Sequence, residues 1–153
     1  MAGLVPWLMT SWRFEISAWH WEATRWFGAV IVGLSAGCLV HAFVRFVLDG
    51  LGTPAPVAPT ERLVVTGAYR YVRNPMYLAV TGGILGQALL FAQMLLLAYA
   101  TLFLTVTAAF VHWYEEPTLA RRFPAEYAAY RANVPGWWPR RHPWPPSVWP
   151  SPH

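Results

Sequence analysis

Residues 76–114 form a stretch of thirty-nine amino acids that contains no Asp, Glu, Lys or Arg. An α-helix rises about 1.5 Å per residue, so one helix of this length would reach ~58 Å, nearly twice the ~30 Å hydrocarbon core of a bilayer. We therefore expect two helices that fold back near Ala92-Gln93, although neither Gly nor Pro marks the turn. The first helix of this pair would be short for a full crossing.

The rest of the composition agrees with a membrane protein. Hydrophobic residues make up 56% of the 153 residues and charged residues only 12%, whereas soluble domains carry about 25% charged residues. Residues 26–48 form a first spanning helix of roughly 34 Å. Residues 1–25 mix Trp with charged residues, as expected of an interfacial segment or of the first turns of that helix. We predict a single all-α domain, 1–153, with about three transmembrane helices.

Proline residues divide the remainder of the chain. Three of them make residues 50–61 a linker. Asn74-Pro75 favours a helix that starts at the proline. Glu115-Glu116-Pro117 suits the first turn of another helix, and Pro124 restarts a short one over 125–133. From Pro135 the chain should lie extended on the surface or be disordered, and residues 142–153 form a tail rich in Pro and Trp.

Arginine and tryptophan positions both predict the topology. In a three-crossing arrangement nine arginines fall on one side, and only Arg13 and Arg25 on the other. The nine are Arg45, Arg62, Arg70, Arg73, Arg121, Arg122, Arg131, Arg140 and Arg141. The positive-inside rule then places these arginines in the cytoplasm, most simply at a bacterial inner membrane, with the N-terminus outside. None of the ten tryptophans lies between residues 27 and 112, as an aromatic belt requires. The loop 62–77 and the segment 112–141 should therefore be neighbours.

This shared face would gather arginines, carboxylates and tyrosines from both segments. They are Tyr69, Arg70, Arg73, Asn74 and Tyr77 from the loop, and His112, Tyr114, Glu115, Glu116, Arg121, Arg122, Tyr127, Tyr130 and Arg131 from the second segment. An arginine can clasp a carboxylate, and a glutamate can accept hydrogen bonds from an ammonium or a ribose diol, so the set suits a zwitterionic ligand. Arginines at a cytoplasmic membrane surface also form collars that face anionic lipid.

The order of two motifs around the apolar hairpin adds a family resemblance. GAYRYVRNPMYL, then the hairpin, then HWYEEPTLARRFPAEYAAYRANVPGWWPR, resembles the isoprenylcysteine carboxyl methyltransferase and phospholipid methyltransferase superfamily, and looks most like its short bacterial members. The resemblance covers residues 62–141. It implies an integral membrane enzyme that uses S-adenosylmethionine, with the cofactor between the two motifs at the cytoplasmic face.

The resemblance also implies roles for single residues. By matching position, the cofactor-binding residues are Tyr69, Arg73, Asn74, Pro75, Tyr77, Glu115 and Glu116, and Glu116 is the stronger candidate for a direct polar contact. Asn74 stands where the eukaryotic carboxyl methyltransferases have histidine. Gly136 stands where many relatives have arginine. Such departures weaken the inference, from the resemblance, that this chain acts on a prenylcysteine substrate.

The catalytic candidates are His112 and Arg73. Methyl transfer from a sulfonium depends mainly on positioning and desolvation. An amine acceptor must arrive unprotonated, and His112 is the candidate general base. The alternative for His112 is a histidine at the membrane boundary bonded to a neighbouring carbonyl. Arg73 stays charged, so it suits holding the cofactor carboxylate better than proton transfer.

The methyl acceptor should be lipophilic and enter between the helices. His41, Arg45 and Arg131 are candidates for lining its site, and the alternative for Arg45 is an ion pair with Asp49. The acceptor atom can belong to a carboxylate, a thiol or an amine. Alternatives are a phospholipid N-methyltransferase and a small non-enzymatic membrane protein whose arginine collar binds anionic lipid. With one cysteine, Cys38, a Cys-based metal site is impossible, and we expect neither a metal nor a nucleic-acid partner.

Overall fold

The computed structural model describes residues 22–50 and 63–145, and every regular element within these ranges is a helix. The predicted all-α class is thus confirmed for the described residues. The expected interfacial segment up to residue 21, the linker 51–62 and the last residues of the tail, 146–153, lie outside them. The chain divides into two compact units, one with residues up to Leu39 and Tyr77–Ala108, the other with Val40–Met76 and residues from Ala109 onward.

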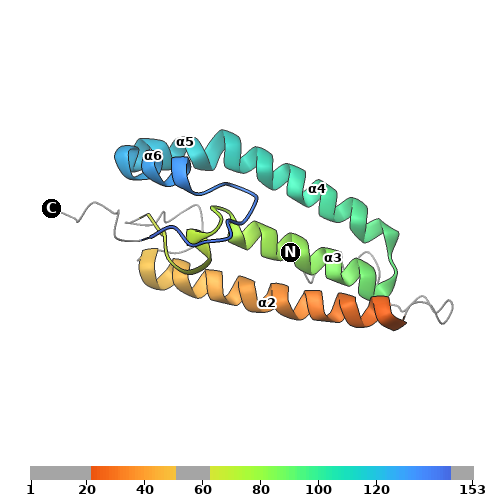
Figure 1. Cartoon of the computed structure of the whole chain (residues 1–153). Helices are drawn as coiled ribbons and strands as arrows, with labels where there is room; N and C mark the ends of the chain where they lie inside the picture. The colour runs from red at the N-terminus through yellow and green to blue at the C-terminus, as the bar shows by residue number, and fades with distance from the viewer. Residues whose placement is uncertain (1–21, 51–62, 146–153) are drawn as a thin grey trace. The chain divides into compact units, whose positions relative to one another are not determined.

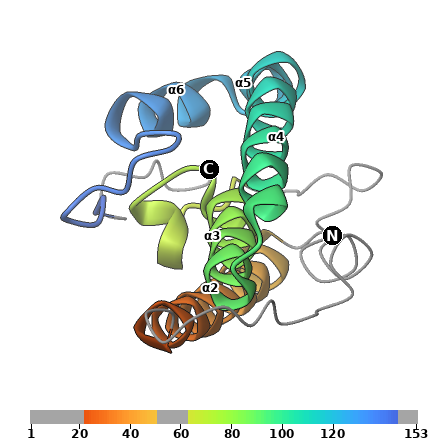
Figure 2. The same cartoon turned by 90° about the vertical axis from the view of Figure 1, so that its right-hand side faces the viewer.

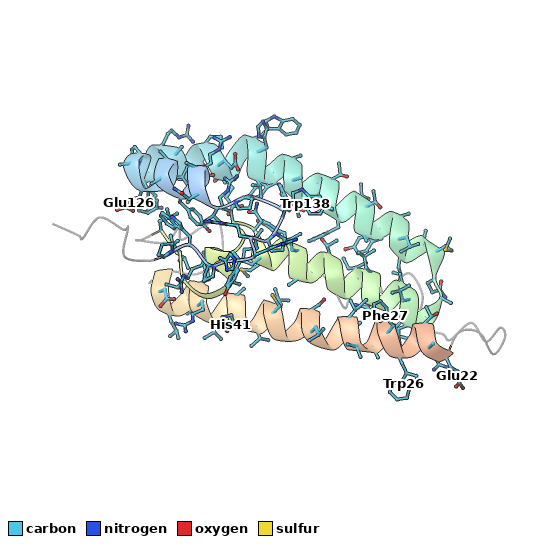
Figure 3. All side chains as sticks on the ribbon, in the orientation of Figure 1. Glu22, Trp26, Phe27, His41, Glu126 and Trp138 are labelled. Carbon is cyan, nitrogen blue, oxygen red and sulfur yellow. The ribbon has the colours of Figure 1, made fainter. Side chains whose placement is uncertain are left out.

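Two helical stretches are long and apolar enough to cross a membrane. They are Glu22–Asp49, within α2 (Glu22–Gly50), and Met94–Arg122, which begins with α4 (Met94–Phe110). The helix predicted over residues 26–48 is therefore present as one of these two candidates, and it begins four residues earlier than expected. Many of its apolar side chains are exposed, such as Trp26, which is 75% exposed and points away from the helix (Figure 3). An apolar surface of this extent suits contact with lipid.

The helical hairpin turns where the sequence predicted. α3 (Pro75–Phe91) ends and α4 begins on either side of Ala92-Gln93. Ala92 has a φ of +53°, in the left-handed region that non-glycine residues rarely adopt. The Gln93 amide donates to the Ala88 carbonyl at 3.0 Å and so closes the end of α3. With 17 residues α3 is shorter than a full span, as expected, and the number of crossings and their orientation stay predictions.

In the first unit α3 packs against both α2 and α4 (Figures 1 and 2). Gly86 lies against Gly28 of α2, where a Cβ built on Gly28 would stand 2.7 Å from the Gly86 carbonyl oxygen. On the α4 side, a buried apolar cluster joins Ile84, Ala88, Leu96 and Ala100. Gly82 also lies close to α2, since a Cβ there would stand 2.7 Å from Ser35 Oγ. Gly33 and Gly37 of α2 differ, because among the described residues nothing lies within 4 Å of a Cβ at either position.

The close approach of α2 and α3 predicts opposite effects for two identical substitutions. Gly28→Ala places a methyl group 2.7 Å from backbone atoms of Gly86 and Leu90, so we expect a loss of about 1–3 kcal/mol. Gly33→Ala on the same helix meets open space and should be neutral or stabilising by up to ~1 kcal/mol, since alanine favours helix. Unfolding midpoints in detergent measure both, and equal destabilisation would contradict the packing.

The helical stretch that begins with α4 continues without a break past the two glutamates, which corrects the sequence-based expectation that a separate helix starts there. It passes through a π-helix, η3 (Val111–Glu115), directly into α5 (Glu116–Arg122). The Glu116 amide bonds to the Val111 carbonyl, five residues back. Pro117 explains this wider turn, because in an α-helix its ring would clash with the carbonyl four residues earlier.

The C-terminal part of the second unit surrounds a small aromatic core. α6 (Pro124–Asn133) begins at Pro124, within one residue of the prediction. Tyr127 and Tyr130 share its buried face, as predicted, and pack with Val134 and Trp144. Trp144 is only 4% exposed. The expectation that the chain from Pro135 lies on the surface or is disordered is therefore wrong for this residue, because an indole ring gains more by filling the core beside the two tyrosines.

Candidate functional site

The polar loop, residues 67–74, begins at a glycine that no other residue can replace without strain. Gly67 has a φ of +55° and starts a 3₁₀ helix, η2 (Gly67–Arg70). A Cβ there would also lie 2.8 Å from His41 Nε2 and 3.0 Å from Arg45 Cγ. The end of α2 therefore packs directly on the start of the loop. Figure 3 labels His41 on that part of α2.

The loop ends at Asn74-Pro75, where both residues are buried. Pro75 opens α3, which confirms the predicted helix start. The Asn74 side chain donates from Nδ2 to the Gly136 carbonyl at 3.1 Å. The amide of Arg73 donates to the Pro135 carbonyl at 2.9 Å. The C-terminal segment, residues 134–144, therefore accepts hydrogen bonds from both the backbone and a side chain of the polar loop.

An ion pair joins the two predicted halves of the site. Arg73 Nη1 donates to Glu116 Oε1 at 2.7 Å and to the Tyr127 hydroxyl at 2.9 Å. Both partners of the ion pair are largely buried, each with a side chain 14% exposed. Arg131, which is 57% exposed, reaches Glu116 Oε2 at 3.5 Å from the outside. The expectation that the loop and the glutamate-containing segment are neighbours is thus confirmed.

One edge of the Arg73 guanidinium carries a buried donor that no described residue satisfies. Its Nε is buried and has no hydrogen-bond partner among the described residues. Its Nη2 faces Gly136, where a Cβ would stand only 3.1 Å away. An unsatisfied buried donor costs about 1–3 kcal/mol. Nε and Nη2 together form the fork with which arginine binds a carboxylate through two hydrogen bonds.

Burial also sets the protonation of the tyrosines at this centre. Burial raises the pKa of Tyr127, an effect that the Arg73 charge opposes and the Glu116 charge reinforces. Burial likewise raises the pKa of Tyr130, whose hydroxyl donates to the Tyr69 carbonyl at 2.7 Å. Both phenols are therefore neutral at physiological pH.

These shifts predict a loss of stability in alkaline solution. A tyrosine whose pKa is higher in the folded state than the unfolded value of about 10 stabilises the fold fully below that pH. The contribution falls as pH rises above about 10 towards the folded-state pKa. Tyr127→Phe should therefore reduce the decline in unfolding free energy above pH 10. Unfolding at a series of pH values measures this, and an unchanged alkaline decline would contradict it.

The buried ion pair predicts unequal costs for two glutamates. Glu116→Gln removes the charge that neutralises Arg73, and breaking one partner of a buried pair costs about 3 kcal/mol. Glu126, in the first turn of α6 (Figure 3), is the matched control, and Glu126→Gln should cost less than about 1 kcal/mol. Unfolding free energies give the comparison, and a Glu116→Gln cost as small as that of the control would overturn the assignment.

The other predicted cofactor residues lie in different settings. Tyr69 is buried, its ring 6.4 Å from that of Phe46. Glu115 is half-buried on η3. Tyr77 is half-buried on α3 and belongs to the first unit, where its carbonyl accepts from the Thr81 hydroxyl. Roles for these three residues in cofactor binding stay predictions.

The predicted base is not joined to the Arg73–Glu116 pair. His112 is exposed on η3, with its ring edge-on to Trp113 at 6.3 Å. Within the described ranges no hydrogen bond or ion pair links it to either partner of the pair. The structure thus leaves His112 available to solvent or to an acceptor, and its catalytic role stays a prediction.

The predicted acceptor-lining residues of α2 sit at the other end of the loop. His41 is exposed and packs on Gly67. Arg45 lies 3.8 Å from Asp49, so the ion pair that the sequence left as an alternative is present. Asp49 also accepts a hydrogen bond from the Thr66 hydroxyl. These bonds anchor the loop to α2.

Sequence reasoning missed the contribution of the C-terminal segment to this site. It placed Tyr127 on the same face as Arg73 without predicting their contact, and it gave no structural role to Pro135, Gly136 or Trp144. A Pro- and Trp-rich stretch has no periodicity that would indicate its partners. The one available signal was the buried aromatic pair on α6, which needs a further large side chain to cover it.

Comparison with known families agrees with the motif analysis. A family model described as phospholipid methyltransferase matches residues 23–126, which is more than half of the chain. The match includes Arg73 and Glu116, extends back through most of α2 and ends just before Tyr127. Searches of curated proteins and of solved structures find no match.

Proposed function

The chain belongs to the phospholipid methyltransferase family, and from this we propose that it transfers a methyl group from S-adenosylmethionine to a lipid-like acceptor. The observation that carries the proposal is the Arg73–Glu116 ion pair. It joins the two segments on which the family resemblance rests, although they are 43 residues apart in sequence. The exposed apolar faces of α2 and α4 are consistent with an acceptor that arrives from the bilayer.

The donor set at the pair fits the amino-acid end of this cofactor. The Nε–Nη2 edge of Arg73, with its unpartnered buried Nε, would hold the carboxylate. Glu116, and Glu115 beside it on the same helix, would accept from the ammonium or the ribose diol. Binding at that edge leaves the 2.7 Å bond from Nη1 to Glu116 intact. Because Nε is buried and Gly136 lies against Nη2, the chain that covers this edge would have to move aside for the carboxylate to reach it.

When bound, S-adenosylmethionine supplies an electrophilic methyl group on a cationic sulfur, which leaves as a neutral thioether when an acceptor lone pair takes the methyl. The chain's own contribution is to orient and to exclude water. The neutral Tyr127 phenol holds Arg73 in place without adding charge. For an amine acceptor a proton must also leave, and His112, exposed four residues before Glu116, is the proposed base.

We further propose that the site lies at the cytoplasmic face of a bacterial inner membrane. The arginines clustered on the second unit, such as the exposed Arg121, Arg122 and Arg141, favour this side. The family match favours the amine of a phospholipid headgroup as the acceptor. A carboxylate or thiol acceptor is the alternative that the isoprenylcysteine-like motif suggests.

Methyl transfer and the acceptor class can be tested together. Membranes containing the protein are incubated with methyl-labelled S-adenosylmethionine, and the lipid extract is separated. We expect label in a lipid headgroup amine that stays non-volatile after mild alkali, because N-methyl bonds are stable where methyl esters release methanol. Label lost as methanol would instead identify a carboxylate acceptor.

A matched pair of glycine variants serves as the control. Gly136→Ala places a methyl group 3.1 Å from Arg73 Nη2 and should lower the rate about tenfold or more. Gly33→Ala, which meets open space, should leave the rate unchanged. Wild-type membranes that transfer no label above that of membranes lacking the protein would refute the proposed enzyme and favour the arginine collar.

A further inference from the structure

The C-terminal segment, residues 134–144, runs alongside the polar loop and is bonded to it repeatedly (Figure 1). Its carbonyls at Pro135 and Gly136 accept from the Arg73 amide and from Asn74 Nδ2. Its amide at Arg140 donates to the Tyr71 carbonyl at 2.9 Å. These bonds fall within one short stretch of the loop, and two of them are made to Arg73 and Asn74. The segment thus constrains the residues that the proposed cofactor site depends on.

The far end of the segment is fastened by a reciprocal pair of hydrogen bonds. The Trp144 amide donates to the Arg70 carbonyl at 3.0 Å, and Arg70 Nε donates to the Trp144 carbonyl at 2.8 Å. The indole ring is buried and lies 6.1 Å from the Tyr130 ring. The Arg70 guanidinium therefore bonds to the backbone of the segment, whereas the sequence suggested an arginine that faces a ligand or lipid.

The contacts at the two ends of the segment, at Pro135 and at Trp144, together hold it beside the Arg73 side chain. Between the contacts at Pro135 and Trp144 the chain is irregular, with no helix to hold it. Gly136 lies against Arg73 Nη2, so any shift of the segment changes what covers the Nε–Nη2 edge of the guanidinium. The family match ends at residue 126, so this wall is supplied by a part of the chain beyond the matched region.

We infer that Arg70 and Trp144 are positioning residues, which hold residues 134–144 against Arg73 and Asn74 and so set the geometry of the ligand-binding edge. The inference rests on the proposed function for the identity of the ligand. It goes beyond that function by assigning a wall of the site to residues that follow position 126, where the family-model match ends. A purely stabilising role would lower the unfolding midpoint and leave the affinity of the folded protein unchanged.

The test compares two arginine-to-alanine variants of the full chain in detergent. Arg70→Ala removes the bond to the Trp144 carbonyl, and we expect its Kd for S-adenosylmethionine to rise about tenfold. Arg70→Lys, which keeps a donor, should recover part of the loss. Arg141→Ala removes an equal charge from an exposed position on the same segment and should bind as the wild type does.

Amide hydrogen exchange provides a readout that needs no ligand. In Arg70→Ala the amides of Arg73 and Arg140, which bond across to and from the segment, should exchange faster. Amides in the α3–α4 hairpin should not change, which would show that the fold persists. If Arg70→Ala does not fold, Trp144→Phe provides the second variant, since it keeps an aromatic ring in the core but packs less tightly.

Each result decides the inference. Faster exchange with an unchanged Kd means that the segment does not set the binding geometry, and unchanged exchange means that Arg70 does not hold the segment. Either outcome overturns the inference while leaving the proposed function intact. If the wild type itself does not bind S-adenosylmethionine, the proposed function fails. Hydrogen exchange at the Arg73 amide in Arg70→Ala, which needs no ligand, then decides whether Arg70 holds the segment.

Discussion

The second unit depends on one buried interaction, the ion pair between Arg73 and Glu116. Removing two charges from water is expensive, and the pair is tolerable only with good geometry and further hydrogen bonds. The structure supplies these with a 2.7 Å contact, the Tyr127 hydroxyl and a more exposed second cation at Arg131. The arrangement still leaves Arg73 Nε buried without a partner among the described residues. This buried donor is the basis of the proposal that Arg73 binds an anionic ligand group.

Backbone features on each side bring the two partners together. On one side, Gly67 adopts a left-handed conformation where no Cβ would fit against His41, and the loop then leads to Arg73. On the other, Pro117 sits within a continuous helix because the π turn before it removes the steric clash. π turns are frequent at functional sites, since one extra residue changes which side chains face a partner. Here the turn immediately precedes Glu116.

Several features could be predicted from the sequence because a single physical constraint determines each. The absence of charge from residues 76–114 and the thickness of a bilayer required a turn near Ala92, and the turn is there. Asn74-Pro75 disfavours helix at Asn74 and suits a helix that starts at Pro75, where α3 begins. The proximity of Arg73 and Glu116 followed from topology and from the family motifs together.

The features that could not be predicted are those for which the local sequence is compatible with more than one structure. Pro117 suits the first turn of a helix and also the end of a π turn, and only the packing of the whole helix decides between them. Gly33 and Gly37 have the same spacing as Gly82 and Gly86, yet α3 packs near Gly28 instead. Trp144 lies in a Pro-rich stretch with no period, so its burial beside Tyr130 depends on contacts distant in sequence.

The most direct measurement compares two ligands that differ only in the group assigned to Arg73. The affinities of purified protein for S-adenosylmethionine and for its decarboxylated form give the contribution of the carboxylate. With Arg73 in place the carboxylated ligand should bind at least about tenfold more tightly, because a bidentate charge-assisted contact is lost in the other. In Arg73→Ala, or in Gly136→Ala where the edge is obstructed, the preference should disappear. Equal affinity of the wild type for both ligands would contradict the assignment of Arg73 to the cofactor carboxylate.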